Sequence, residues 1–287
     1  MKKSDRTALV AFPIVVALGY LVGLAGSQGG TTVAKYPVFA LAVGLAFLIQ
    51  WLAFIPAYLL QTEKFFDLTG GITYIFVTII TLYFSGIDAR SMLLSALVIV
   101  WAVRLGSFLF RRIHKAGKDG RFDELKPSFI RFLNVWTIQG LWVTFTASAA
   151  LVAISSTSRQ ELDLFAIIGF LIWLIGFAIE VAADSQKSHF SADPANKGKF
   201  IQTGLWARSR HPNYFGEIVL WIGIAVIALP VLHGWQWVAL ISPIFVTLLL
   251  TRVSGVPLLE KRADDKWGGQ KEYESYKATT PVLIPKL

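Results

Sequence analysis

The sequence predicts an all-α protein that is a polytopic transmembrane helical bundle. Of its 287 residues, 55% are hydrophobic and only 16% are charged. The mean hydropathy is +0.59, whereas a soluble domain carries about 25% charged residues. The apolar residues also form long runs, and a helix needs roughly 20 of them to cross a bilayer. The chain has no cysteine, which excludes disulfides and thiolate metal sites.

Eight apolar segments follow one another along the chain. They are Ala8–Gly26, Tyr36–Leu60, Ile72–Ile87, Ser91–Phe110, Phe132–Ile154, Leu164–Ala183, Tyr214–Leu232 and Trp235–Ser254. The third is short, and Gly70-Gly71 precedes it, so we expect a break over Gln61–Gly71. The charge pattern of the connections suggests eight spans, and the number falls to seven if one of the two segments beside the break does not cross. We expect a single domain over 1–287.

The polar connections alternate in charge, which predicts the topology. The basic or polar ones are the N-terminus, Gln61–Gly71, Arg111–Arg131, Asp184–Asn213 and the tail after Arg252. The positive-inside rule places these on the cytoplasmic side, with the C-terminus. The net charge of +9 therefore calls for no nucleic-acid partner. The sequence predicts a multi-pass protein of a bacterial inner membrane.

A dense polar cluster leads directly into the seventh apolar segment. It contains Arg208, Arg210, His211, Asn213, Tyr214 and Glu217. A carboxylate at the membrane boundary, such as Glu217, is expensive and needs partners. The Arg, His, Asn and Tyr side chains suit a phosphate-rich or zwitterionic ligand. The alternative is an interfacial anchor of snorkelling Arg and Tyr.

The end of the sixth segment carries a second cluster. Glu180 and Asp184 are four residues apart and share a helix face, and Lys187 lies nearby. The carboxylates could accept ribose or amide hydrogen bonds while Lys187 reaches a phosphate. A solvated helix end also accounts for Asp184 and Lys187, but not for Glu180, which lies a turn deeper.

Three other places have polar groups that could bind a cofactor. Arg104 lies inside the fourth segment, where it needs an anionic partner or a wet cavity. Gln139 lies in the fifth segment, where a helix-joining hydrogen bond and a ligand contact are both open. Glu260 and Arg262 belong to an amphiphilic tail that could fold over a ligand.

The predicted break carries candidate catalytic groups. Glu63 and Asp67 lie beside aromatic residues and the glycine pair, and Tyr74 follows one turn after the pair. A carboxylic acid in apolar surroundings can stay protonated and donate a hydrogen bond to a carbonyl. The alternative role for Asp67 is a helix cap.

From about Gln61 to the C-terminus the chain resembles the steroid 5α-reductase family. Its superfamily includes sterol reductases and isoprenylcysteine carboxyl methyltransferases. The best-defined parts are Glu180/Asp184, Gly204-Leu205-Trp206 with Arg208–Glu217, and the stretch from Tyr273/Tyr276 to Pro285. The Arg-His-Pro-x-Tyr core is shared across the superfamily.

The resemblance implies a seven-span bundle with NADPH in a cytoplasm-facing cavity. The residues similar to the family's cofactor contacts are Arg104, Glu180, Asp184, Asn213 and Glu217. Asp67 is similar to the catalytic acid. Trp101 stands where the family has its catalytic Tyr, and the family's tail His is also absent, so Tyr74 or Glu63 is expected to replace the hydroxyl.

Two enzyme classes and a transporter follow as hypotheses. The first is NADPH-dependent reduction of the C=C of a conjugated lipid ketone, above all a 3-oxo-Δ4 steroid. The alternative is an S-adenosylmethionine-dependent membrane methyltransferase. A transporter is disfavoured because the polar groups gather at one face. The four His residues share no metal-ligand spacing, and neither a Walker loop nor GxGxxG occurs. The expected partners are membrane lipids and a steroid-like substrate entering from the bilayer; no protein partner is inferable.

Overall fold

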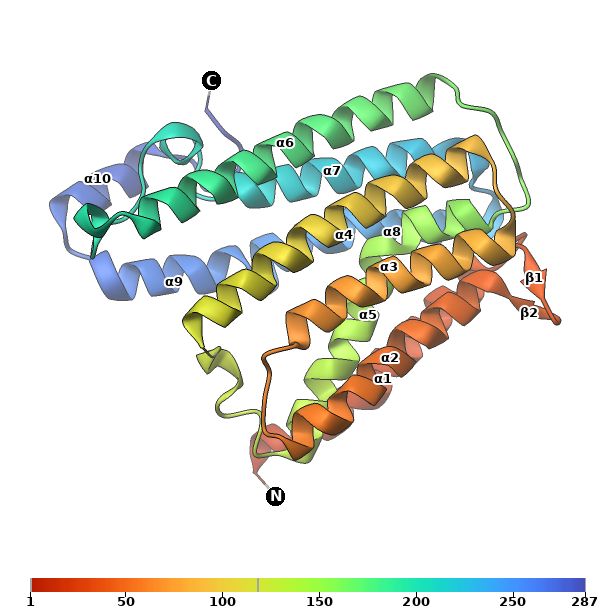
Figure 1. The fold of residues 1–287 in the computed structure, drawn as a ribbon, viewed down its shortest axis with the longest axis horizontal. Coiled ribbons are helices and arrows are strands. Elements are labelled where there is room, and N and C mark those ends of the chain that lie inside the picture. The colour runs from red at the N-terminus through yellow and green to blue at the C-terminus, as the bar shows by residue number, and fades with distance from the viewer. Residues whose placement is uncertain (1, 118, 287) are drawn as a thin grey trace. The chain divides into compact units, whose positions relative to one another are not determined.

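The protein is described by a computed structural model that covers residues 2–117 and 119–286. Most of this part is helical (Figure 1). The α-helices are α1 (Lys3–Gly26), α2 (Val38–Leu59), α3 (Phe66–Ser85), α4 (Ala89–Ala116), α5 (Phe129–Ser155), α6 (Leu164–Ala192), α7 (Pro212–Ala228), α8 (Ile241–Leu248), α9 (Val256–Trp267) and α10 (Lys271–Thr279). The shorter helical elements are η1 (Gly120–Phe122), η2 (Pro194–Asn196), η3 (Gly204–Ala207), η4 (Leu229–Val231), η5 (Gly234–Leu240) and η6 (Leu249–Val253).

A small hairpin is the only sheet in the described residues. Strand β1 (Thr32–Val33) pairs antiparallel with β2 (Tyr36–Pro37). The two turn residues, Ala34 and Lys35, have φ of 48° and 72°. Positive φ at both central positions is the signature of a type I′ turn, which suits the twist of a two-residue hairpin.

Eight helical stretches in the described part of the chain are long and apolar enough to cross a membrane. This confirms the polytopic all-α prediction. Both α2 and α3, which flank the predicted break, meet the criterion, so the count favours eight spans. The last stretch, Gly234–Trp267, is composite, because η5, α8, η6 and α9 follow one another there.

The predicted break is shorter than expected, and Gly70-Gly71 lies inside α3. A Cβ on Gly70 would lie 2.5 Å from Nε2 of Gln139, and one on Gly71 would lie 3.4 Å from Cα of Gly106. The glycine pair therefore allows close approach of α5 and α4 and does not end a helix. Asp67 accordingly lies in the first turn of α3.

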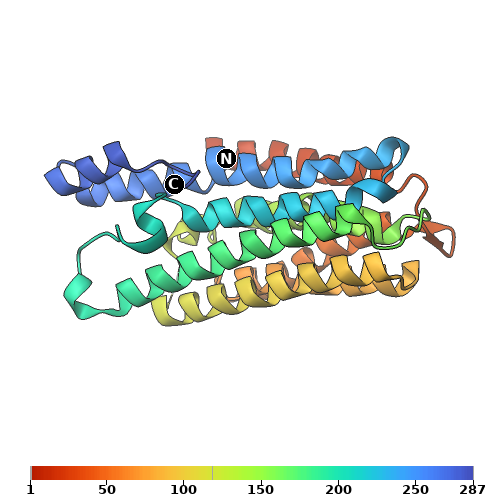
Figure 2. The same ribbon diagram turned by 90° about the horizontal axis from the view of Figure 1, so that it is seen from above.

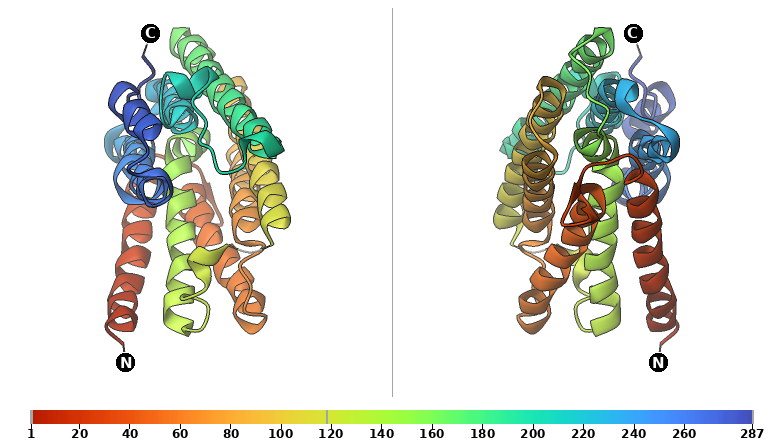
Figure 3. Two further views of the ribbon diagram at one scale, coloured as in Figure 1. Left: turned by 90° about the vertical axis from the view of Figure 1, so that its left-hand side faces the viewer. Right: turned by 90° about the vertical axis from the view of Figure 1, so that its right-hand side faces the viewer.

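The chain forms two compact units that interleave along the sequence. The first runs to Ala166 and includes Ile227–Ser242; the second comprises Ile167–Val226 and the chain from Pro243. In the first unit, α5 packs against α1, α2, α3 and α4. Figure 3 shows α5 running between α1 and α2. The central place of α5 explains why it is the most buried of the candidate spans.

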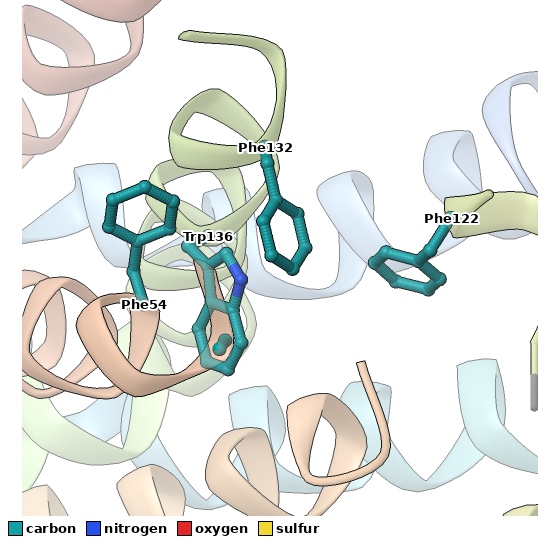
Figure 4. Packing of buried hydrophobic residues seen from close by; sticks show 5 residues of the cluster. Phe54, Phe122, Phe132 and Trp136 are labelled. Atoms are coloured by element: carbon teal, nitrogen blue, oxygen red, sulfur yellow. The ribbon is translucent and has the colours of Figure 1, made fainter. Parts of the chain in front are cut away.

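An aromatic cluster holds one end of the first unit together (Figure 4). Phe54, Phe122, Phe132 and Trp136 are all buried. The rings of Phe132 and Trp136 are 6.1 Å apart, with planes at 73°. Such edge-to-face pairs add about 0.5–1.5 kcal/mol beyond their burial. Phe122 brings the α4–α5 connection onto this core.

In the second unit, α6 and α7 run side by side (Figure 2). A Cβ on Gly176 would lie 2.5 Å from the backbone N of Leu220. One on Gly223 would lie 2.6 Å from the carbonyl O of Gly169. The backbones therefore touch, as small residues permit in membrane helices.

Candidate functional site

The first unit places two predicted catalytic residues on one face of α3. Asp67, Gly71 and Tyr74 are separated by four and three residues and therefore share that face. The ring of Tyr74 meets Trp101 of α4 edge-on, with centroids 5.1 Å apart. Oδ2 of Asp67 lies 4.0 Å from Nη2 of Arg112. A carboxyl and a phenol thus follow one another along the α3–α4 contact.

Glu63 has different surroundings from Asp67, although it lies only one turn away in sequence. Its Oε2 is 2.6 Å from Nζ of Lys126, and its Oε1 accepts from the backbone N–H of Asp119 at 2.9 Å. Burial raises the pKa of Glu63, but these hydrogen bonds outweigh it and hold the pKa below its usual range. Glu63 is therefore an anionic acceptor that joins the α2–α3 and α4–α5 connections.

Two predicted cofactor residues of the first unit have structural contacts. Nε2 of Gln139 donates to the carbonyl O of Phe66 at 3.1 Å, which joins α5 to the start of α3. The guanidinium of Arg104 lies 5.5 Å from the ring centroid of Phe108, one turn along α4. The helix-joining alternative for Gln139 is thus observed, and its ligand role stays a prediction.

In the second unit, the start of α7 meets α9. Nε2 of His211 is 2.8 Å from Oε1 of Glu260, and Nη2 of Arg210 is 3.1 Å from Oε2 of the same carboxylate. The ring of Tyr214 stacks on His211, with centroids 5.6 Å apart. Only 6% of the His211 side chain is exposed. Four predicted cofactor residues are therefore connected here, with Glu260 joining Arg210 to His211 and the His211 ring meeting Tyr214.

The same end of α7 also meets α6. Nδ2 of Asn213 donates to Oδ1 of Asp184 at 3.1 Å. Glu180, one turn earlier on α6, is buried. A Cβ on Gly216 would lie 2.6 Å from the backbone N of Glu180, so the two helices touch at this level. Glu217 follows in α7 and is half-buried.

Lys187 lies at the edge of this group. Its Nζ sits 4.4 Å from the ring centroid of Trp206, in a cation–π contact. Nε1 of Trp206 donates to the carbonyl O of Ala183 on α6 at 3.0 Å. The Lys187 side chain is exposed, so a phosphate could still reach its ammonium group.

The tail is tied to the segment that precedes α7. The backbone N–H of Arg210 donates to the carbonyl O of Pro281, and that of Lys286 donates to the carbonyl O of Arg208, both at 2.9 Å. The side chains of Arg208 and Arg262 are exposed, so neither joins the buried group.

Three buried polar atoms at the start of α7 have no hydrogen-bond partner within the described protein. They are Nδ1 of His211, Oδ1 of Asn213 and Nε of Arg210. Buried polar atoms are normally satisfied. A helix N-terminus with these groups and nearby carboxylates suits the phosphates and ribose hydroxyls of a dinucleotide. Two open hollows, of about 620 and 530 Å³, lie on the surface of this unit, and no predicted site residue lines either.

The sequence did not predict Lys126 as the partner of Glu63. The two residues are 63 positions apart and lie in different connections. Lys126 is one of many cations in a basic loop, and nothing in its sequence neighbours distinguishes it. Ser209 was also missed; its Oγ donates to the carbonyl O of Leu283 at 2.8 Å and helps to hold the tail.

A protein-family model described as "Protein of unknown function (DUF1295)" matches residues 53–280. The chain belongs to this family. The predicted resemblance to steroid 5α-reductases is confirmed by two curated relatives that the chain matches. "3-oxo-5-alpha-steroid 4-dehydrogenase 1" of Mus musculus is 29% identical over 120 residues, which are 42% of this chain and 41% of the relative. "Steroid 5-alpha-reductase DET2" of Gossypium hirsutum is 30% identical over 117 residues, 41% of this chain and 40% of the relative.

A shorter match extends to another reaction class. "Probable O-methyltransferase ustE" of Ustilaginoidea virens is 32% identical over 66 residues, 23% of each chain. The chain thus spans about two fifths of the length of the steroid-reductase relatives it matches. No solved structure matches it significantly.

Proposed function

We propose that this integral membrane protein uses NADPH to reduce the C=C of a conjugated lipid ketone, with a 3-oxo-Δ4 steroid as the substrate class. The observation that carries the proposal is the similarity to relatives named for 3-oxo-steroid and steroid 5α-reductase chemistry. The α3 face with Asp67 and Tyr74 supports it, because it carries a carboxyl and a phenol two turns apart along one helix of an apolar bundle.

The chemistry needs hydrogen-bond donors for a developing enolate. Bound NADPH would supply a hydride, and negative charge would then build on the substrate's carbonyl oxygen. A protonated Asp67 and the hydroxyl of Tyr74 would donate to that oxygen before the charge develops. Glu63 does not suit this role, because its oxygens already accept from Lys126 and Asp119. The apolar bundle would admit the substrate from the bilayer and exclude water.

The cofactor would be held mainly by residues of the second unit. The start of α7 and the end of α6 would bind it, with Lys187 and Arg208 at the exposed edge. Arg210 would meet phosphate groups, as arginine's fork of N–H donors suits phosphate oxygens. Roles of Arg104 and Gln139 in cofactor binding stay predictions from the sequence. We propose that the tail and this site are cytoplasmic.

The short match to an O-methyltransferase supports a second candidate, S-adenosylmethionine-dependent methyl transfer. The two are distinguished by ligand-dependent thermal stability of the purified protein in detergent. Saturation at about 100 times Kd stabilises a protein by roughly 2.7 kcal/mol. We expect NADPH to raise the unfolding temperature and S-adenosylmethionine to have little effect. The reverse result would replace the reductase by the methyltransferase.

A further inference from the structure

The hydrogen bonds of Glu260 fix the orientation and tautomer of His211. Both oxygens of this carboxylate are engaged, Oε1 with Nε2 of His211 at 2.8 Å and Oε2 with Nη2 of Arg210 at 3.1 Å. A carboxylate can only accept hydrogen bonds, so Nε2 of His211 must carry the proton. Nδ1, the other ring nitrogen, is then a lone-pair acceptor when the imidazole is neutral.

Arg210 meets the second oxygen of Glu260, so the carboxylate is held by partners on both of its oxygens. The His211 side chain is only 6% exposed, and polar atoms buried to this degree normally have hydrogen-bond partners. Nδ1 has no hydrogen-bond partner within the described protein. The site therefore presents one oriented acceptor that is buried and unsatisfied.

We propose that Nδ1 of His211 accepts a hydrogen bond from a hydroxyl or amide N–H of the bound cofactor, and that Glu260 is a positioning residue that keeps Nδ1 in the acceptor form. This inference rests on the proposed function, because the ligand is the proposed NADPH. NADPH offers such donors as ribose hydroxyls, the carboxamide and the adenine amino group. The stacking of Tyr214 on the other side of the ring keeps the imidazole plane fixed.

Two substitutions at His211 separate the ligand contact from the structural contact. His211→Asn places an amide oxygen near the position of Nδ1 and removes the group that meets Glu260. His211→Gln reaches Glu260 and provides nothing at the position of Nδ1. We expect the dissociation constant of NADPH to rise about tenfold in His211→Gln, the scale of one hydrogen bond, and less than threefold in His211→Asn. A purely structural His211 would give the opposite order.

The role of Glu260 is tested by a double-mutant cycle. Glu260→Gln can face His211 with its NH₂ group, which allows the proton to move to Nδ1 and converts the acceptor into a donor. We expect this change to weaken NADPH binding about tenfold in the wild-type background and hardly at all in His211→Asn, which has no tautomer. Equal losses in both backgrounds would show that Glu260 acts independently of His211.

The measurement is equilibrium binding, followed by fluorescence of the reduced nicotinamide. Adenosine 2′,5′-bisphosphate and reduced nicotinamide mononucleotide, measured by calorimetry, show which half of the cofactor contacts His211, since only one should lose affinity in His211→Gln. Unchanged affinity for NADPH and for both halves in His211→Gln would overturn the inference while leaving the reductase proposal intact. If the wild type binds S-adenosylmethionine and not NADPH, the proposed function fails. The inference about NADPH then fails with it.

Discussion

At the scale of single residues, neighbours in sequence have acquired opposite environments. Glu63 and Asp67 both lie in the polar stretch before an apolar helix, and their types and spacing did not separate their roles. The difference arises from Lys126 and the amide of Asp119, which satisfy Glu63 and leave Asp67 at the α3–α4 contact. Partners so distant in sequence carry no local signal, and the same holds for His211 and Glu260.

The two carboxyls should therefore respond differently to removal of the acid. Asp67→Asn keeps a donor but loses the acidic proton, so we expect NADPH affinity to persist and turnover of a 3-oxo-Δ4 steroid to fall by about 10², the scale of one oxyanion donor. Single-turnover oxidation of bound NADPH measures this. Glu63→Gln is the matched control. The folded fraction of this variant should carry out the chemical step at the wild-type rate. A slow step in Glu63→Gln with a normal one in Asp67→Asn would assign the acid to Glu63.

The ion pair between Glu63 and Lys126 makes the free energy of unfolding depend on pH. The pKa of Glu63 is lower in the folded protein than in the unfolded chain, so its contribution is present above the unfolded pKa and is lost as pH falls through the folded value. The pKa of Lys126 is raised, chiefly by its hydrogen bond to Glu63, so its contribution is lost only at high pH. Glu63→Gln should cost about 1–3 kcal/mol at neutral pH, because the largely buried Lys126 loses its closer carboxylate and keeps only Asp123 at 3.4 Å. Thermal unfolding in detergent between pH 3 and 7 should show a smaller acid loss in this variant than in the wild type.

At the scale of elements, apolar length predicted the helices and glycine was harder to interpret. Each predicted segment overlaps an observed helix. A long hydrophobic run in lipid forms a helix because a helix satisfies the backbone hydrogen bonds within the segment itself. Gly70-Gly71 indicated a break in sequence, yet it lies inside α3 and admits Gln139 and Gly106. Glycine occurs both where a helix ends and where two helices pack closely. The two cases differ in whether a neighbouring helix lies against the glycine, which the sequence does not show.

The α6–α7 contact should be sensitive to a single methyl group. A Cβ on Gly176 would lie 2.5 Å from the backbone N of Leu220 and 2.6 Å from the carbonyl O of Gly216, and a backbone cannot move aside as a side chain does. We expect Gly176→Ala to destabilise the protein by about 1–3 kcal/mol. Gly44→Ala is the control, since nothing lies within 4 Å of its Cβ position. Helix propensity should make that change stabilising by about 0.5–1 kcal/mol. Equal thermal shifts for the two variants would contradict close packing of α6 on α7.

At the scale of the whole molecule, the number of spans determines the sides on which the ends lie. Eight spans place both ends on the same side of the membrane, whereas seven spans place them on opposite sides. The sequence could not choose, because the resemblance implied seven and the charge pattern suggested eight. The structure has long apolar helices on both sides of the 60–65 connection, which favours eight. Because the site residues lie near the tail, this count also bears on which compartment supplies the cofactor.

The absence of cysteine makes this topology directly measurable. Three exposed residues mark the connections: Ser4 lies in the first turn of α1, Gln160 between α5 and α6, and Ser275 on α10. Each is replaced by cysteine and labelled in sealed vesicles with a membrane-impermeant maleimide. With eight spans, Ser4→Cys and Ser275→Cys should react from the same side, and Gln160→Cys from the other. The positive-inside rule makes the shared side cytoplasmic, where NADPH is available.

If α2 or α3 does not cross, Gln160→Cys should react from the side of Ser4→Cys, and Ser275→Cys from the opposite side. That result would agree with the seven-span bundle that the resemblance implies. The reductase proposal fails if Ser275→Cys reacts from the side opposite the cytoplasm, because the α7 site lies near the tail and NADPH would then be out of reach.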